Sequence, residues 1–268
     1  MTMQTSFIVL FYLLATGALT VNTFRPNISP VLARGMMLIC GAIALHIHAN
    51  ILLRMMFTDS GLNLGLLVSI SLVSWTVTLI VYLASFYQQT QSLMILLFPL
   101  SAVCVIGSQL LDEHRILGEQ LTNGLKIHIV LSISAYSLLF IGTLQALLMR
   151  YQEKLLLAKK AILVMNILPP LQVMEHLLLR FIIVGFFLLS LSLATGLMFI
   201  NDMFSQHLVH KTVLSILAWL IYGVLLCGHW FAGWRGKRIT RWAVGGFITL
   251  LLAYLGTKFV LELVLDRV

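Results

Sequence analysis

The feature that most constrains this chain is its succession of apolar stretches, each about as long as a helix needs to cross a lipid bilayer. A helix rises 1.5 Å per residue, so roughly 20 apolar residues span the hydrocarbon core. Hydrophobic residues make up 60% of the 268 residues, and charged residues only 10%. Transmembrane β-strands would alternate in polarity, and an open sheet could not pair its backbone groups in lipid. The sequence therefore predicts an all-α polytopic membrane protein.

Eight apolar stretches are long enough to act as transmembrane helices, and we predict that they form a bundle in a single domain over residues 1–268. The predicted spans are 7–20, 35–53, 62–87, 93–111, 125–148, 177–200, 213–231 and 242–265. Residues 1–6 carry no positive charge, so we expect the first span to be retained rather than cleaved as a signal. The connector 151–168 mixes lysines with leucines and is interpreted either as a helix lying on the membrane surface or as a plain linker.

The distribution of charge predicts the orientation of the chain. Basic residues gather in the loops after the first, fifth and seventh spans, which all fall on one side of the membrane: Arg25, Arg34, Arg150, Lys154, Lys159, Lys160, Arg235, Lys237, Arg238 and Arg241. The loops on the other side carry acidic residues instead. Because basic loops stay in the cytoplasm, we expect these loops to be cytoplasmic and both termini to face outward. The net charge of +8 therefore reflects membrane topology and does not indicate nucleic acid binding.

Histidines inside the apolar spans are the best candidates for function. A neutral imidazole is costly to bury in hydrocarbon without a partner, and it is also a common ligand of haem iron. His46 shares a helix face with Asn50, four residues further on, whereas His48 points elsewhere and is expected to serve helix packing. Both an interhelical hydrogen bond and iron ligation are open to His46.

His128 begins a polar stripe along the fifth span, which Ser132 and Tyr136 continue at intervals of four residues. Such a stripe is expected to face protein or a cavity rather than lipid. It is compatible with interhelical hydrogen bonds and, alternatively, with an axial ligand that neighbouring polar groups support.

Two further histidines belong to the region of the seventh span. His229 lies beside Trp230 near the inner end, where anchoring at the membrane interface is the alternative to a ligand role. His210 lies near the outer end and is either a solvated loop residue or an outer ligand. Depth along the helices permits an outer pair, His128 with His210, and a deeper pair, His46 with His229. The sequence leaves both pairings open.

Several longer stretches, from the second span to the C-terminus, together match a family pattern. They include LHIHANILLRMMF, GLNLGLLVSISLVSW, KIHIVLSISAYSLL, HKTVLSILAWLIYGVLL and GWRGKR. These stretches resemble the cytochrome c assembly family of haem-handling membrane proteins, the CcsA/CcmC/HemX group, and most closely its short YpjD-like bacterial inner-membrane branch. The resemblance implies eight spans, haem as the ligand and a location in a bacterial inner membrane, so that both termini lie on its periplasmic side. It also implies that His128 matches an outward-facing histidine, that His46 matches a membrane-embedded one, and that His229 lies near the place of a second embedded one.

Two parts of that family pattern are missing. Members that deliver haem to cytochrome c carry a tryptophan-rich segment before the seventh span, where this chain reads NDMFSQHLVHK. A second outward histidine near the last span is also absent, because the chain reads LGTKFVLEL there. Both departures argue against attachment of haem to apocytochrome c. His210 is the residue that could substitute as an outer ligand.

The leading hypothesis is a non-enzymatic haem-binding or haem-trafficking protein with His128 and His46 as axial ligands, acting in cytochrome c maturation or tetrapyrrole homeostasis. Its partners would be the lipid bilayer, haem and other haem-handling or cytochrome c assembly proteins. No P-loop, HExxH, GxSxG or CxxCH motif points to an enzyme. The alternative is a HemX-like regulatory or scaffold protein whose basic loops dock a cytoplasmic partner. A small-molecule transporter is disfavoured, because the chain shows no internal repeat and no mid-membrane carboxylate.

Overall fold

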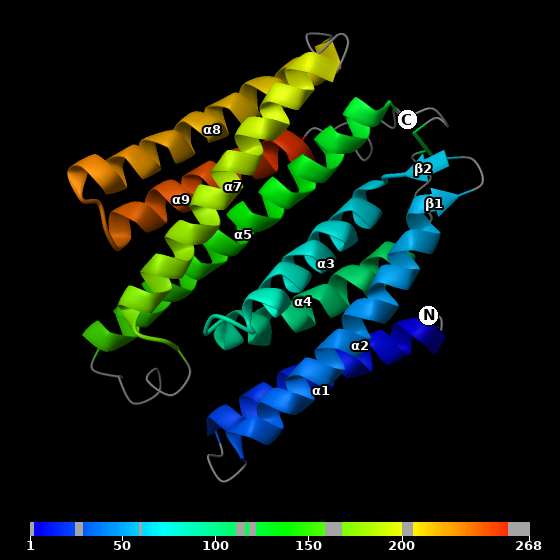
Figure 1. Cartoon of the computed structure of the whole chain (residues 1–268), viewed down its shortest axis with the longest axis vertical. Coiled ribbons are helices and arrows are strands. Elements are labelled where there is room, and N and C mark those ends of the chain that lie inside the picture. The colour runs from blue at the N-terminus through cyan, green and yellow to red at the C-terminus, as the bar shows by residue number, and fades with distance from the viewer. Residues whose placement is uncertain are drawn as a thin grey trace. The chain divides into compact units, whose positions relative to one another are not determined.

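Helices account for nearly all of the structure. A computed structural model describes residues 3–24, 29–58, 61–110, 116–117, 122–158, 168–199 and 206–256. Seven helices in these ranges are long and apolar enough to cross a membrane (Figure 1): α1 (Met3–Phe24), α2 (Pro30–Met56), α3 (Leu66–Ala84), α4 (Gln91–Leu110), α5 (Asn123–Leu157), α7 (Leu171–Phe199) and α8 (Gln206–Ala232). The prediction of a helical, multi-pass membrane protein is confirmed.

The eighth predicted span corresponds in part to α9 (Lys237–Leu251), which runs directly into a π-helical turn, η1 (Leu252–Gly256). The rest of the predicted span 242–265 lies outside the described residues. The count of eight spans within one domain therefore stays a prediction, as does the periplasmic placement of both termini.

Several helices are longer than their apolar stretches. α5 continues beyond its predicted end at residue 148, through Arg150 and Lys154 to Leu157, and α7 begins at Leu171 rather than at residue 177. Hydropathy marks only the part of a helix that crosses lipid, whereas Leu, Gln, Glu, Lys and Arg favour helix beyond it as well. The first part of the connector 151–168 is therefore a continuation of α5, and residues 159–167 lie outside the described part.

The described residues form two compact units, and the first contains α1 to α4. Within it α1 packs against α2 and α4, and α3 packs against α4. This unit also contains a small antiparallel sheet in the order β1 (Phe57–Thr58), β2 (Gly61–Asn63) and β3 (Ile116–Leu117). The apolar pattern predicts a span that begins at residue 62. However, Gly61 has a φ of 128°, and the side chain of Asn63 accepts a hydrogen bond from the backbone nitrogen of Gly65 at 3.0 Å. These turn features delay the start of α3 to Leu66.

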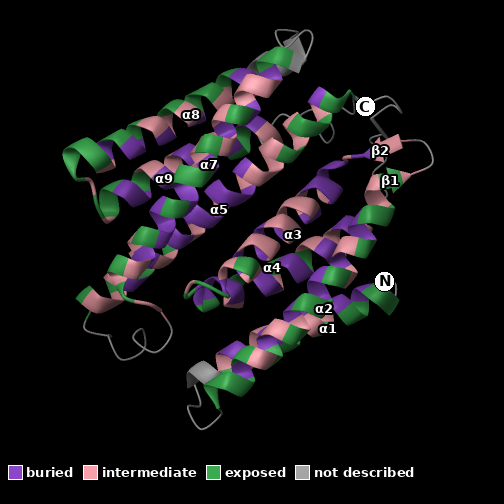
Figure 2. Cartoon of the chain, in the orientation of Figure 1, coloured by how far each residue is buried: buried purple, intermediate pink, exposed green. Residues whose placement is uncertain are grey.

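The second unit contains α5, α7, α8, α9 and η1. Its most extensive helix pair is α5 with α7, and α9 packs against both α5 and α8 (Figure 1). Two glycines allow α5 and α7 to approach closely. A Cβ atom at Gly142 would lie 2.9 Å from Ile182, and one at Gly185 would lie 2.8 Å from Leu139. Figure 2 shows the buried middle of α5 that results from this packing.

Candidate histidine sites

His128 lies in the second turn of α5 and faces the C-terminal half of α7. Its Nδ1 atom is 2.9 Å from the backbone oxygen of Ser192 and 3.3 Å from Oγ1 of Thr195. The Ser132 hydroxyl donates to the backbone oxygen of His128 at 2.6 Å and lies 2.8 Å from the Ser192 hydroxyl. We call these four residues, His128, Ser132, Ser192 and Thr195, the His128 cluster.

The neighbours of His128 determine which ring nitrogen carries the hydrogen. A carbonyl oxygen can only accept, so Nδ1 donates to Ser192 and Nε2 keeps its lone pair. Among the described residues, the Ser132 hydroxyl lies 3.4 Å from Nε2, but it makes a much shorter bond to the backbone oxygen of His128. The imidazole is also half-buried. A metal-binding histidine typically has the same arrangement, with its second nitrogen bonded to a carbonyl oxygen.

The polar stripe that begins at His128 faces protein, as the sequence predicted. Ser132 reaches α7 through its contact with Ser192. One turn further along α5, the hydroxyl of Tyr136 donates to the backbone oxygen of Leu250 in α9, and its ring lies 5.6 Å from the ring of Tyr254. The stripe therefore joins α5 to α7 and to α9.

Sequence reasoning missed the half of the His128 cluster that α7 contributes. Ser192 and Thr195 lie within the run LSLSLATG, and their spacing of three residues puts them on one helix face. Hydroxyl side chains on one face of an apolar span are the signal that could have found them. Within the described ranges, no group of three or more His, Cys, Asp or Glu side chains could hold a metal ion.

His48 is fully buried in the first unit, and both of its ring nitrogens have partners. Nδ1 lies 3.0 Å from the hydroxyl of Tyr12 in α1, and Nε2 lies 3.0 Å from the hydroxyl of Ser71 in α3. The Tyr12 ring also packs edge-on against the imidazole. His48 therefore joins α1, α2 and α3, and its expected role in helix packing is confirmed.

His46 lies on an exposed face of α2 together with Asn50 and Arg54. The side-chain nitrogen of Asn50 donates to the backbone oxygen of His46 at 2.9 Å and lies 3.2 Å from its Nε2. The shared face of His46 and Asn50 is confirmed. Ligation by His46 stays a prediction.

His229 stabilises the turn between α8 and α9 through a hydrogen bond. Its Nδ1 donates to the backbone oxygen of Trp234 at 2.9 Å, and the backbone nitrogen of Trp234 donates to Gly228 at 3.1 Å. A side chain at position 228 has no room, because a Cβ atom there would lie 2.4 Å from the Trp234 ring. This contact gives His229 a structural role in the turn, and both its anchoring at the membrane interface and its ligand role stay predictions.

His128 and His229 lie at opposite ends of the second unit. The Thr240 hydroxyl, at the start of α9, donates to the backbone oxygen of Ala146 at 3.5 Å. Ala146 is about 27 Å further along α5 than His128. These two histidines therefore cannot share one iron.

The backbone of His210 belongs to the first turns of α8, and its side chain lies outside the described part of the chain. The pairings of His128 with His210 and of His46 with His229 stay predictions.

Comparisons with known proteins agree with the family pattern in the sequence. The family model for the cytochrome C assembly protein matches residues 36–265. The inner membrane protein YpjD of Escherichia coli (strain K12) is 34% identical over 233 residues, which cover 86% of this chain and 88% of that protein. The cytochrome c biogenesis protein CcsA of Prochlorococcus marinus (strain MIT 9515) is 34% identical over 88 residues, 32% of this chain and 28% of that protein. No solved structure matches the chain significantly.

The matched range begins in α2, includes His46, His128 and His229, and extends beyond η1. The resemblance drawn from the motifs is thereby confirmed. With its seven candidate membrane spans, the chain is a multi-pass inner-membrane protein. It belongs to the cytochrome c assembly protein family.

Proposed function

We propose that this chain is a non-enzymatic haem-handling protein and that His128 binds haem iron as an axial ligand. Membership of the cytochrome c assembly family supports haem as the cargo. The observation that carries the assignment to His128 is the hydrogen bond from its Nδ1 to the backbone oxygen of Ser192. That bond leaves the Nε2 lone pair as the basic atom of the ring, which is the state in which histidine binds iron.

The residues around His128 fit a ligand of this kind. The backbone oxygen of Ser192 and the hydroxyl of Thr195 hold the imidazole at Nδ1, and Ser132 bridges α5 to α7 beside it. Because two helices orient the ring in advance, little side-chain entropy is lost when iron binds. Haem supplies the iron and a flat apolar ring, and the chain supplies an oriented nitrogen donor.

His46 is proposed as a second ligand. It is exposed on α2, and its Nε2 lies 3.2 Å from the amide nitrogen of Asn50, a weak bond that iron could replace. The proposed partners are other haem-handling or cytochrome c assembly proteins that supply or accept the haem. Attachment of haem to apocytochrome c is not part of the proposal, because the tryptophan-rich segment is missing.

Absorption spectroscopy of the purified chain tests the role of His128. The wild-type protein in mild detergent, supplied with haem, is expected to show a Soret band. His128→Gly should lose most of that band, and added free imidazole should restore it, because imidazole can occupy the space of the missing ring. His176→Ala, which removes an exposed histidine from the first turns of α7, is the matched control and should keep the wild-type band.

Two results would count against the proposal. A wild-type protein with no Soret band after addition of haem would refute haem binding. A His128→Gly protein with an unchanged band would exclude His128, and the spectra of His46→Ala and His229→Ala would then identify the ligand. Size-exclusion chromatography of each variant separates loss of ligation from loss of folding.

A further inference from the structure

We infer that the turn between α8 and α9 binds the headgroup of an anionic phospholipid. We call this turn, together with the first turns of α9, the basic turn and define it by four cationic residues: Arg235, Lys237, Arg238 and Arg241. All four side chains are exposed. The inference does not rest on haem binding, because the basic turn and His128 lie at opposite ends of the second unit.

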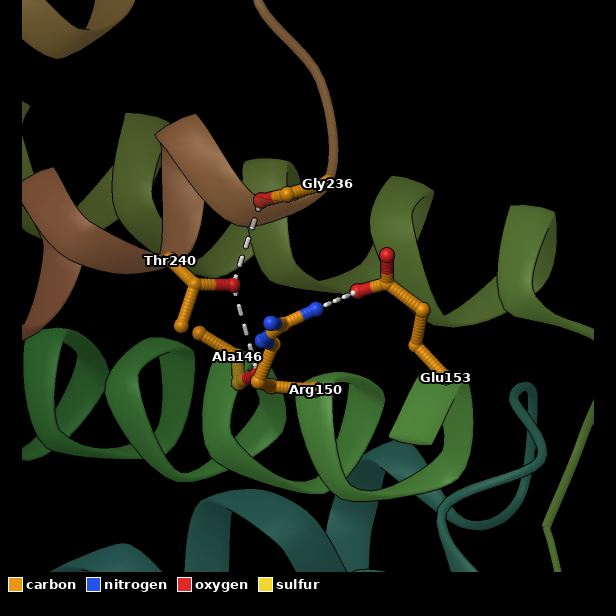
Figure 3. A network of polar contacts seen from close by, with 5 residues as sticks. All are labelled: Ala146, Arg150, Glu153, Gly236 and Thr240. Atoms are coloured by element: carbon orange, nitrogen blue, oxygen red, sulfur yellow. Dashed lines mark hydrogen bonds and ion pairs between the residues drawn. The ribbon is translucent and has the colours of Figure 1, made fainter. Parts of the chain in front are cut away.

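The positive charge of the basic turn is not balanced within its own helices. Residues 206–256 contain no Asp or Glu. None of the acidic side chains that the structure describes forms an ion pair with the four cations. Arg150, at the neighbouring end of α5, differs in this respect, because it pairs with Glu153 at 2.6 Å. Figure 3 shows this pair close to the point where Thr240 of α9 contacts α5.

Exposed aromatic side chains lie next to these cations. Trp230 is 59% exposed and Phe231 is 88% exposed in the last turn of α8. Trp234 and Trp242 lie with their ring centroids 5.5 Å apart, and the guanidinium of Arg238 lies 5.4 Å from the Trp234 ring. Aromatic rings beside cations at the end of a transmembrane helix are typical of the headgroup region of a bilayer.

The backbone of the basic turn is held in place before any ligand arrives. Its beginning is held by two hydrogen bonds, one from Nδ1 of His229 to the backbone oxygen of Trp234 and one from the backbone nitrogen of Trp234 to the backbone oxygen of Gly228. The Thr240 hydroxyl lies 3.2 Å from the backbone oxygen of Gly236 and 3.5 Å from that of Ala146. These contacts hold the end of the basic turn against α5. A ligand therefore meets side chains on a rigid support, so little backbone entropy is lost on binding.

An anionic phospholipid matches both parts of this surface. Its phosphate complements the unpaired cations, and its acyl chains lie beside the exposed rings of Trp230 and Phe231 at the end of the span. An acidic soluble protein or free phosphate would match the charge but not the exposed rings, which lie at the end of a membrane span. Each cation near an anionic membrane surface contributes about fivefold to affinity.

Tryptophan fluorescence of the full chain in vesicles tests the inference. The probe is dibrominated phosphatidylglycerol, titrated into phosphatidylcholine vesicles that contain the protein, with dibrominated phosphatidylcholine as the neutral reference. Three of the five tryptophans, Trp230, Trp234 and Trp242, lie at the basic turn, so a bound brominated lipid quenches a large part of the emission. We expect phosphatidylglycerol to quench at a lower mole fraction than phosphatidylcholine.

In the double variant Arg235→Gln/Arg238→Gln, the preference for phosphatidylglycerol over phosphatidylcholine should fall by a factor of at least about ten. The control double variant Lys126→Gln/Arg150→Gln removes the same number of charges but leaves the basic turn intact. It should keep the wild-type preference. Circular dichroism of both variants reports whether the helices are retained.

Several outcomes would overturn the inference. Equal quenching by the two lipids in the wild type would show that the basic turn does not select anionic lipid. An equal loss in the control variant would assign the preference to net charge alone. Competition by inorganic phosphate in the aqueous phase at millimolar concentration would identify a site for the free anion instead. If the wild type shows no lipid preference while Arg235→Gln/Arg238→Gln abolishes function in cells, the basic turn docks a soluble partner.

Discussion

At the scale of single residues, the hydrogen-bond partners of an imidazole and its burial determine whether a ring nitrogen is available to bind a metal. His48 has a hydroxyl on each ring nitrogen, from Tyr12 and Ser71, and is fully buried, so it is available only to its own helices. His128 is half-buried, with a carbonyl oxygen at Nδ1 and no comparably short bond at Nε2 among the described residues. The two histidines thus differ in chemistry, because the basic ring nitrogen of His48 is engaged by a hydroxyl at 3.0 Å, whereas the Nε2 atom of His128 has no hydrogen bond as short.

The bond between His48 and Tyr12 is expected to couple α1 to α2 energetically. Tyr12→Phe should destabilise the protein by about 0.5–1.5 kcal/mol, and His48→Leu by more, because it leaves two buried hydroxyls without their partner. The double variant should cost less than the two single costs added together, with a coupling of about 0.6–1.7 kcal/mol. Unfolding in mixed micelles with increasing dodecyl sulfate measures each difference.

Thr16→Val provides the control for this cycle. The Thr16 hydroxyl bonds to the backbone oxygen of Tyr12 within α1, so its loss should add independently to that of His48→Leu. Additive behaviour of Tyr12→Phe with His48→Leu would contradict the coupling.

At the scale of secondary-structure elements, the α5–α7 pair positions the His128 cluster. Gly142 and Gly185 allow the two backbones to approach, and side-chain atoms already occupy the space that a Cβ atom would need at either position. Ser192 follows Gly185 by seven residues and therefore lies on nearly the same face of α7. The close contact at Gly185 and the hydrogen bond from His128 to Ser192 thus depend on the same placement of α7 beside α5.

Gly185→Ala is expected to disturb both features. The new methyl group would lie 2.8 Å from Leu139 and 3.2 Å from the Cβ atom of Leu138, so α7 must shift, at a cost of about 1–3 kcal/mol. The Soret band of the haem-loaded protein should shift or weaken with it. Gly245→Ala in α9 is the control, since nothing lies within 4 Å of a Cβ atom there, and alanine favours helix. Equal stability of the two variants, measured by thermal unfolding, would be inconsistent with close packing at Gly185.

At the scale of the whole molecule, the sequence predicts helices better than it predicts their contacts. Apolar length identifies a membrane helix because the bilayer sets that length, but it does not register the polar continuation of α5 to Leu157. The hairpin before α3 depends on the backbone of Gly61, which hydropathy does not report. Ser132 can be predicted beside His128 because both lie on one helix. The hydroxyl-bearing face of α7 can be found in the sequence, but its contact with His128 cannot, because that contact depends on which two helices pack together.

The charge asymmetry of the second unit predicts which end faces the cytoplasm. The exposed cations of the basic turn lie at one end, and His128 lies near the other. Since basic loops are retained in the cytoplasm, we expect the His128 end to face the periplasm. The test uses a variant whose three native cysteines are replaced by serine, with a single new cysteine from Lys126→Cys or Arg235→Cys. In sealed spheroplasts, a membrane-impermeant maleimide should label the Lys126→Cys variant but not the Arg235→Cys variant. After permeabilisation it should label Arg235→Cys as well.

The reverse labelling pattern would place His128 at the cytoplasmic face and contradict the predicted orientation. Labelling of both positions in sealed spheroplasts would indicate that the chain inserts in two orientations. That result would weaken the charge argument itself, because the four cations of the basic turn would then fail to hold their loop in the cytoplasm. The substitution Arg235→Cys removes one of those four cations. A labelling position that keeps Arg235 is therefore useful. Gly233→Cys is unsuitable for this purpose, because Gly233 has a φ of 61°, which a cysteine rarely adopts. Ala232→Cys, at the exposed end of α8, keeps all four cations and should give the same labelling as Arg235→Cys.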